Sequence, residues 1–359
     1  MHAPLVVLGG GPGGYAAAFM AADLGMEVTL VEKDTRLGGT CLLRGCIPSK
    51  ALLHVGRVVA EAREMQEWGV NFSAPKIDID AVRNRKEKVI GALTGGLAQL
   101  AKRRNVEVVQ GQAIFTSSNA IEVIQKGSDS KKLTFDHCIL ASGSRPARIP
   151  AFDIGSSRVM DSTAALQLED VPDSLLVIGG GYIGLEMGTV YAELGSRVSV
   201  VELTDGLLPG ADRDLVKPLH KRLKGLFEAI LLETKVVGLD DIGNGVEVSF
   251  EGPDGKTSET FSRVLVAVGR RPNSDGIGLE NTNVVVDSKG FVEVDRQQRT
   301  ADSHILAIGD VCGEPMLAHR ASHQGKVAVE SLHGEPALFD PRAIPAVVFT
   351  DPEIAWAGL

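Results

Sequence analysis

Two segments of this chain carry the same pattern of apolar residues, glycines and acids. They span residues 5–33 and 175–203 and align without a gap at a shift of 170 positions. In each, a short run of branched apolar residues predicts a buried parallel strand, three glycines lead into a helix, and the next apolar strand ends in an acid. This is the βαβ fingerprint of a dinucleotide-binding unit, and two complete copies predict two bound dinucleotides.

Each glycine of the fingerprint has its own task. The first permits the tight turn, the second lets the backbone approach the pyrophosphate, and the third lets helix and strand pack closely, with the phosphates on the helix N-terminus. The motif glycines are Gly9, Gly11 and Gly14 in the first unit and Gly179, Gly181 and Gly184 in the second. Glu32 and Glu202 end the second strands, where a carboxylate can accept hydrogen bonds from a ribose.

The rest of the pattern predicts two long helices and three strands that end in glycine turns. The helices are expected over Lys50–Trp68, closed by Gly69, and over Ile79–Asn105, followed by short strands within Val106–Gln125. The strand-and-turn segments are 133–146, 264–273 and 303–311. The first two deliver backbone to the cofactor clefts. The third places Asp310 where it either binds the polyol of a flavin or acts only as a turn or cap residue.

A pair of cysteines follows the first unit, in the stretch GGTCLLRGCIPSK. Cys41 lies nine positions after Glu32 and five before Cys46. Fully extended, five residue steps span about 16 Å, yet a disulfide needs Cα atoms within about 7 Å, so a bonded pair requires a turn of distorted helix. Pro48 suits the first helical position, so Cys46 is expected at a helix N-terminus, whose dipole stabilises a thiolate. We interpret the pair as a redox disulfide beside a nucleotide cofactor; the alternative is two buried structural cysteines.

Composition narrows the classes of function. The chain has 359 residues, enough for two or three domains, with ordinary globular values of 44% apolar and 23% charged residues. Because the net charge is −9, the basic clusters at 83–88 and 101–105 are better explained as solvated helix faces than as a nucleic-acid site. No apolar run approaches the roughly 20 residues of a membrane span, and no secretion or transit segment is visible. Four cysteines are too few for a secreted disulfide framework, so we expect a reducing, cytoplasmic location, with Cys138 and Cys312 simply packed.

Together these motifs resemble the flavin disulfide oxidoreductases, the class I pyridine nucleotide-disulfide oxidoreductases. The resemblance runs from about Pro4 to Leu359, is most specific at GGTC…GCIPSK, and is closest to the dihydrolipoamide dehydrogenase branch. Glutathione reductases usually carry Pro-Lys-Lys where this chain has Pro48, Ser49 and Lys50, and they carry basic NADP-binding residues after the second unit. Mercuric reductase is closer at the cysteines, and the C-terminal region that distinguishes it is not in this chain.

The resemblance implies an α/β fold with two Rossmann-like FAD/NAD(P)-binding domains, as in glutathione reductase, and an interface domain that is mostly missing. The implied domains are 1–148 for the first part of the FAD-binding domain, 149–272 for the NAD-binding domain, 273–343 for the central part of the FAD-binding domain, and 344–359 for the start of a dimerisation domain. In the family, that last domain forms a homodimer and supplies a His-Glu pair as acid and base for the substrate of the other subunit.

None of the eight histidines lies in a His-x-His-Pro setting, and His319 is interpreted as a residue near the flavin. The chain is therefore expected to be a truncated form, a gene fragment or a partial sequence, and to turn over lipoamide weakly.

The resemblance also assigns cofactor contacts, and no metal site. FAD would be held by Gly9, Gly11, Gly14, Glu32, Gly39, Thr40, Lys50, Ala113, Ser142, Gly143, Ser144, Asp310, Met316, Leu317, Ala318 and His319. NAD would be held by Gly179, Gly180, Gly181, Tyr182, Ile183, Gly184, Leu185, Glu186, Glu202, Val236 and Gly269. Because Glu202 would repel a ribose 2′-phosphate and residues 203–212 offer no Arg or Lys to receive one, NAD is favoured over NADP.

The implied reaction is oxidation of protein-bound dihydrolipoamide by NAD through FAD and a disulfide. Cys41, farther from the flavin, exchanges with the substrate dithiol, and Cys46 contacts the flavin as a thiolate. Lys50 and Glu186 resemble the pair that the family keeps beside the flavin, where a cation stabilises the reduced flavin and a carboxylate fixes that cation.

The implied partners are the lipoyl domains of 2-oxo acid dehydrogenase complexes and, for the full-length protein, a second copy, with a role in cell redox homeostasis. The alternatives are mercuric reductase or a related flavin disulfide reductase, and an FAD- and NAD-binding fragment without physiological turnover.

Two departures from the family pattern bear on these expectations. Leu43 and Arg44 stand where many members have Asn and Val, which can alter redox poise or access. Tyr182 resembles the aromatic gate of glutathione reductases: it either covers the flavin face until NAD arrives or is a packing tyrosine at the domain seam.

Overall fold

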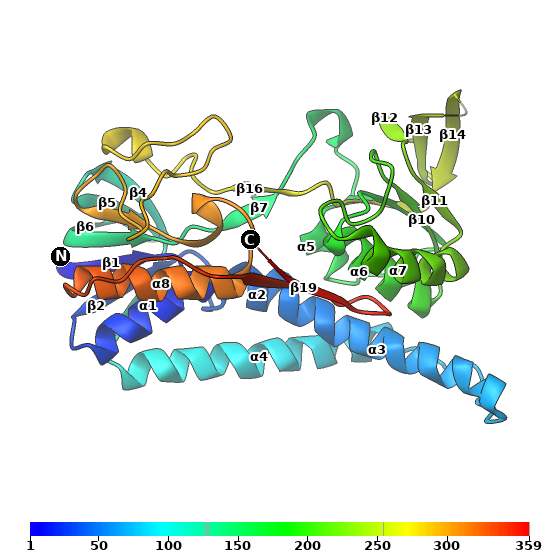
Figure 1. Ribbon diagram of the computed structural model, residues 1–359, viewed down its shortest axis with the longest axis horizontal. Coiled ribbons are helices and arrows are strands. Elements are labelled where there is room, and N and C mark those ends of the chain that lie inside the picture. Colours follow the sequence, from blue (N-terminus) through cyan, green and yellow to red (C-terminus); the bar gives the residue numbers. More distant parts are fainter. Residues whose placement is uncertain (126, 128, 254, 359) are drawn as a thin grey trace.

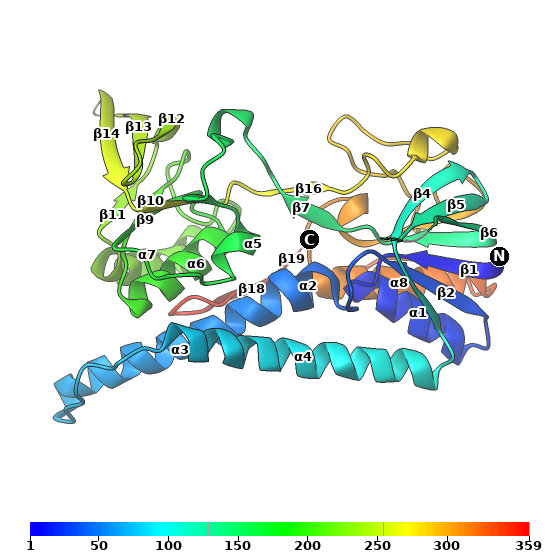
Figure 2. The same cartoon turned by 180° about the vertical axis from the view of Figure 1, so that it is seen from behind.

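The computed structural model describes residues 1–125, 127, 129–253 and 255–358, which form two halves, each built on a parallel sheet (Figures 1 and 2). The first sheet has the parallel order β3-β2-β1-β6, with β17 beside the end of β6 and the antiparallel pair β5-β4 beside its start. Its strands are β1 (His2–Leu8), β2 (Val28–Glu32), β3 (Glu107–Gln110), β4 (Gln112–Ser117), β5 (Ala120–Ile124), β6 (Lys131–Leu140) and β17 (Ile305–Ala307).

Helices α1 (Pro12–Asp23) and α8 (Ala318–Leu332) cover one face of this sheet and lie side by side. Their backbones approach so closely that a Cβ on Gly325 would lie 2.7 Å from the carbonyl oxygen of Gly13. Ala17, Ala18 and Ala21 of α1 and Leu5 and Val7 of β1 belong to one apolar core. The opposite face packs against β4, β5 and the short helix η3 (Leu279–Asn281). The sheet is therefore buried on both sides, as its continuous apolar strands predict.

The second sheet is parallel throughout, in the order β11-β10-β9-β15-β8. Its strands are β8 (Val159–Met160), β9 (Ser174–Ile178), β10 (Arg197–Val201), β11 (Ala229–Leu231) and β15 (Arg263–Val266). Helices α5 (Ser162–Ala165), α6 (Tyr182–Leu194) and α7 (Arg213–Leu226) pack on one face. The antiparallel strands β12 (Lys235–Asp241), β13 (Val246–Gly252) and β14 (Gly255–Phe261) cover the other.

Three kinds of segment join the halves. Helix α2 (Gly39–Arg44) leads into α3 (Cys46–Glu64), which packs against α6 of the second half and against α4 (Ile79–Arg103). Strands β7 (Ser144–Pro146) and β16 (Arg270–Pro272) pair antiparallel where the chain crosses between the halves (Figure 1). The hairpin of β18 (Ile344–Val348) and β19 (Ile354–Gly358) packs into the core of the second half. Short 3₁₀ turns complete the chain: η1 (Met65–Trp68), η2 (Pro150–Phe152) and η4 (Gly309–Cys312).

The predicted elements are present, with one correction near the cysteines. The first long helix continues through η1 and ends at Gly69 in the left-handed conformation, as predicted. Cys46 begins α3, which confirms its predicted place at a helix N-terminus. The position predicted for Pro48 is wrong, since it is the third helical residue rather than the first. Its missing N–H still removes no hydrogen bond, because the first four amides of a helix have no intrahelical partner.

No helix among these described residues is both long and apolar enough to cross a membrane. Leu359, the last residue of the segment 344–359 predicted to begin a dimerisation domain, lies outside the described residues.

Candidate functional site: two nucleotide turns and a cysteine pair

The two glycine turns have the same backbone geometry. Gly9 and Gly179 adopt φ values of +110° and +111°, in the left-handed region that favours glycine. A Cβ at Gly14 would overlap the carbonyl oxygen of Gly9, and a Cβ at Gly184 would overlap that of Gly179. The first and third glycines of each motif are therefore required by the turn itself.

The strand-end acids brace these turns. Glu32 accepts hydrogen bonds from the backbone N–H of Gly10 at 2.6 Å and of Asp34 at 2.8 Å. Glu202 accepts from the N–H of Gly180 at 2.7 Å and from Thr204 through its N–H at 2.8 Å and its hydroxyl at 2.9 Å. Burial raises the pKa of Glu32. Both carboxylates thus have a structural task in addition to the predicted contact with ribose.

Both helix N-termini can receive a phosphate. Helix α1 begins after Gly11 and α6 after Gly181, and in neither does a side chain cap the helix or an acid occupy the first turn. The first-turn amides are therefore not used by local side chains, and the helix dipole favours an anion there. A Cβ at Gly181 would meet nothing within 4 Å, so this turn is open. Gly11 instead faces Gly39, whose own Cβ would lie 2.5 Å from the Gly11 Cα.

That contact places the cysteine helices against the first turn. Cys41 lies on α2 and Cys46 begins α3, and both are half-buried free thiols in this structure. The segment does coil into a helical turn, as predicted for a redox pair. Arg44, between the cysteines, forms an ion pair with Asp34 and so ties α2 to the loop after β2.

The two thiols have opposite acidities. The interaction between the two sulfurs is the largest cause of both pKa shifts. It lowers the pKa of Cys46 to about 7, although burial opposes the shift, with a further contribution from the Lys50 ammonium. The same interaction, together with burial, raises the pKa of Cys41. Cys46 is therefore the more acidic of the two thiols, and its thiolate is the form that the Cys41 thiol stabilises.

A buried carboxylate lies next to this pair. Glu186 of α6 is only 6% exposed and accepts from the Ser49 hydroxyl at 3.0 Å and from the Phe349 N–H at 3.0 Å. The Lys50 ammonium lies 4.0 Å from Glu186 and 3.7 Å from the centroid of the Phe349 ring. The structure thus brings together Lys50 and Glu186, which the sequence reasoning had paired.

A polar network lies where β7 and β16 cross between the halves. Ser144 donates to Asp310 at 2.6 Å, and Arg270 donates to the hydroxyl of Ser144 and to its carbonyl oxygen, both at 2.8 Å. The hydroxyl of Ser142 is buried and has no partner among the described residues. Buried polar atoms normally have partners, so this one points to a bound molecule. The orphaned hydroxyl and the free α1 amides fit a flavin dinucleotide.

The remaining predicted contacts are scattered over several elements. Ala113 is buried in β4, and Val236 is buried in β12. Gly269 precedes β16, and Met316–His319 leads into α8, where the His319 ring contacts the Pro345 carbonyl oxygen at 2.8 Å. Tyr182 is the first residue of α6 and remains 43% exposed, which is unlike a packed seam residue.

Comparison with known proteins identifies the family. The pyridine nucleotide-disulphide oxidoreductase family matches residues 3–325. The chain belongs to this family. It is 50% identical over 360 residues to dihydrolipoyl dehydrogenase of Vibrio cholerae, covering 100% of this chain and 75% of that protein. It is 44% identical over 359 residues to the dihydrolipoyl dehydrogenase of Haloferax volcanii, covering 99% of this chain and 75% of that protein.

Two solved structures have a closely similar fold. LpdA from Mycobacterium tuberculosis has a TM-score of 0.89 at 29% identity, covering 98% of this chain and 77% of that one. The flavoprotein disulfide reductase RclA from Escherichia coli has a TM-score of 0.87 at 27% identity, covering 99% of this chain and 77% of that one. The chain is thus an oxidoreductase, and the predicted resemblance, the α/β Rossmann-like fold and the cofactors FAD and NAD are confirmed.

Sequence reasoning missed several residues that contact the predicted site. Arg270 and Asn273 hold the turn Ser142–Ser144 from across the halves, with Asn273 donating to the Ser142 carbonyl oxygen at 2.9 Å. Phe349 falls in segment 344–359, for which the sequence predicted only the start of a dimerisation domain. Arg270 could have been found from its place directly after Gly269, a predicted cofactor contact, but Phe349 carries no local signal.

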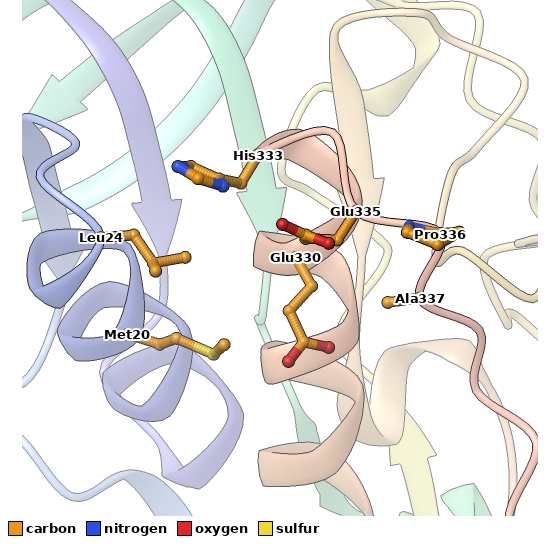
Figure 3. A pocket seen from close by; sticks show the side chains of 7 residues that line it. All are labelled: Met20, Leu24, Glu330, His333, Glu335, Pro336 and Ala337. Atoms are coloured by element: carbon orange, nitrogen blue, oxygen red, sulfur yellow. The ribbon is translucent and has the colours of Figure 1, made fainter.

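Two surface pockets lie away from the glycine turns. One of about 480 Å³ lies between the ends of α1 and α8, where Met20 and Leu24 face Glu330 and His333 (Figure 3). The other, of about 170 Å³, extends from Lys50 between α3, α6 and the β18–β19 hairpin. Among the described residues, no cluster of His, Cys, Asp and Glu is suited to hold a metal ion.

Proposed function

We propose that this chain oxidises dihydrolipoyl groups to lipoyl groups with NAD as the acceptor, through FAD and a Cys41–Cys46 disulfide. The observation that carries the proposal is the dithiol itself. Its helix α2 packs on the first nucleotide turn through Gly39, and its acidic thiol lies next to the Lys50–Glu186 pair. The relatives named dihydrolipoyl dehydrogenase support this substrate.

The acidities of the two thiols support a direction for the exchange. In the oxidised chain, a substrate thiolate attacks the sulfur of Cys41, the Cys41–Cys46 bond breaks, and Cys46 leaves as a thiolate. The second substrate thiol then displaces Cys41 and closes the lipoyl disulfide. Because a thiol of lower pKa leaves faster, the pKa of about 7 at Cys46 favours attack on Cys41 rather than on Cys46. The Cys41 thiol that is released donates its hydrogen bond to the Cys46 thiolate.

Bound FAD would supply the two-electron chemistry that links this dithiol to NAD. The chain would hold FAD through the α1 amides, Ser142 and Asp310, and NAD through the α6 amides and Glu202. Lys50 supplies positive charge near the thiols, and Glu186 restrains it.

The proposed physiological substrates are lipoyl domains of 2-oxo acid dehydrogenase complexes, and the proposed assembly of the full-length protein is a homodimer in the cytoplasm. The proposed domains are those of the sequence analysis, with FAD held by segments 1–148 and 273–343 and NAD by segment 149–272.

The test is NAD-dependent oxidation of dihydrolipoamide by the FAD-loaded protein and three cysteine variants. Cys41→Ser and Cys46→Ser should each lose turnover by at least about a thousandfold, because each removes a sulfur that the exchange requires. Cys138→Ser is the matched control, since Cys138 is a fully buried thiol on β6. Turnover that survives in Cys46→Ser would exclude the proposed reaction, and faster turnover with Hg²⁺ than with lipoamide would favour the mercuric reductase alternative.

A further inference from the structure

We infer that Phe349 is a positioning residue of the thiol site: its ring holds the Lys50 ammonium beside Cys46, and its backbone N–H orients Glu186. Phe349 directly follows β18, in the hairpin that packs against the second half of the molecule. It contacts neither thiol in any hydrogen bond of the described residues, so it acts through its two neighbours.

The Phe349 amide contacts Glu186, and the Phe349 ring contacts Lys50. Each carboxylate oxygen of Glu186 already accepts a hydrogen bond from a neutral donor, one from Ser49 and one from Phe349. The Lys50 ammonium is 4.0 Å from Glu186, which is longer than a charge-assisted hydrogen bond. It is, however, 3.7 Å from the ring centroid, well inside cation–π range. The ring therefore fixes Lys50 where the carboxylate alone does not.

The cleft around Lys50 offers its ammonium other partners. This cleft of about 170 Å³ is lined by Lys50 and Phe349, by the acids Glu193, Asp351 and Glu353, and by Arg57 and His54. Glu193 is buried on α6, and its nearest cation is Arg63, at 3.2 Å. A lysine is a mobile point charge on a flexible stem. Removing the aromatic ring lets Lys50 move along the cleft towards these acids and away from the cysteines.

This displacement changes the charge at the thiolate. The charged and titratable groups that influence Cys46 are Cys41 on α2, Lys50 on α3 and Glu186 on α6, with Tyr15 of α1 and Tyr182 also within electrostatic reach. Lys50 lowers the pKa of Cys46 and Glu186 raises it. Loss of the nearby cation therefore leaves the thiolate less stable. Any effect of this change on lipoyl turnover rests on the proposed function, but the change in the pKa of Cys46 does not depend on it.

The experiment measures the rate of Cys46 carbamidomethylation by iodoacetamide from pH 5 to pH 10 in the reduced protein, resolved by mass spectrometry. In Phe349→Leu the apparent pKa of Cys46 should rise by about half a unit to one unit, so that its alkylation at pH 7 slows about twofold to fivefold. Phe349→Tyr should restore the wild-type profile because it keeps the aromatic face. Phe339→Leu is the matched control, since the Phe339 ring lies over Arg320 instead, at 6.0 Å.

A second variant separates the electrostatics of the ring from its shape. A trifluorinated phenylalanine incorporated at position 349 keeps the ring but weakens its attraction for a cation, and should shift the profile in the same direction as leucine. An unchanged profile in both variants would overturn the inference, as would an unchanged profile in Lys50→Met. Neither lipoamide nor NAD enters the assay, so failure of the proposed function would leave this result standing.

Discussion

At the scale of single residues, the same side chain has different chemistry in each environment. The chain has four cysteines. Burial raises the pKa of Cys138 and Cys312, so these two remain thiols at neutral pH. Only Cys46 has a hydrogen-bond donor, a nearby cation and a helix N-terminus together, and only its pKa is lowered. A reactive thiol is therefore a property of the site and not of the residue type.

The hydrogen bond from Cys41 is the largest contribution to that acidity and can be tested by paired substitutions. Cys41→Ala removes the donor and should raise the pKa of Cys46 by about one unit, since a hydrogen bond to a charged group contributes about 1.5–3 kcal/mol before relaxation. Alkylation of Cys46 at pH 7 should then slow about fivefold. Cys41→Ser keeps a donor and should show a smaller shift. The two variants would behave alike if the hydrogen bond contributed nothing.

Glu202 should make the chain prefer NADH over NADPH. Its carboxylate is fixed at the end of β10 by Gly180 and Thr204, so it cannot move away from a ribose 2′-phosphate. We expect a preference of about 5-fold to 150-fold in flavin reduction at limiting nucleotide, which corresponds to about 1–3 kcal/mol. Glu202→Gln should narrow this preference for NADH. Glu228→Gln should not, because Glu228 lies just before β11 and is paired with Arg197. Equal rates for the two nucleotides in the wild type would refute the assignment.

At the scale of elements, the βαβ units were the most predictable part of the chain. Their strands, glycine turns and helices follow from local patterns, because the apolar period and the steric needs of glycine act over a few residues. The bracing of each turn by its own strand-end acid was not foreseen. Glu32 and Gly10 are 22 residues apart, and only the folded sheet brings the carboxylate to the amide.

Substitutions in the two glycine turns should each weaken the binding of a different cofactor. Gly14→Ala should abolish FAD binding, because its Cβ would overlap the Gly9 carbonyl oxygen and force the turn to open. Gly184→Ala should leave FAD bound and weaken NAD binding, for the same reason at Gly179. Flavin absorbance after gel filtration and NADH titration distinguish the two.

Gly95→Ala is the control for these substitutions. Gly95 is exposed within α4 with nothing within 4 Å of its Cβ position, so alanine should stabilise the fold by about 0.5–1 kcal/mol. FAD retained at wild-type affinity in Gly14→Ala would contradict the role given to the first turn.

At the scale of the whole molecule, the site is assembled from segments that the sequence does not connect. Glu186 and Phe349 are 163 residues apart, and Ser144 and Asp310 are 166 apart. The pairing of Lys50 with Glu186 was foreseen only through the resemblance to a family, since neither residue has a local signal. Arg270 and Phe349 were missed because their partners are far away in the sequence: Ser144 is 126 residues from Arg270, and Glu186 is 163 residues from Phe349. Local pattern therefore predicts the two nucleotide units, and the fold alone shows how they are joined.

The central claim is that electrons pass between a nicotinamide nucleotide and the Cys41–Cys46 pair through the bound flavin. The most direct test is to oxidise the FAD-loaded protein, add NADH without oxygen, and label new thiols for mass spectrometry. We predict that Cys41 and Cys46 both gain the label on addition of NADH, while Cys138 and Cys312 do not change. A flavin that is fully reduced by NADH while Cys41 and Cys46 remain unlabelled would contradict the account.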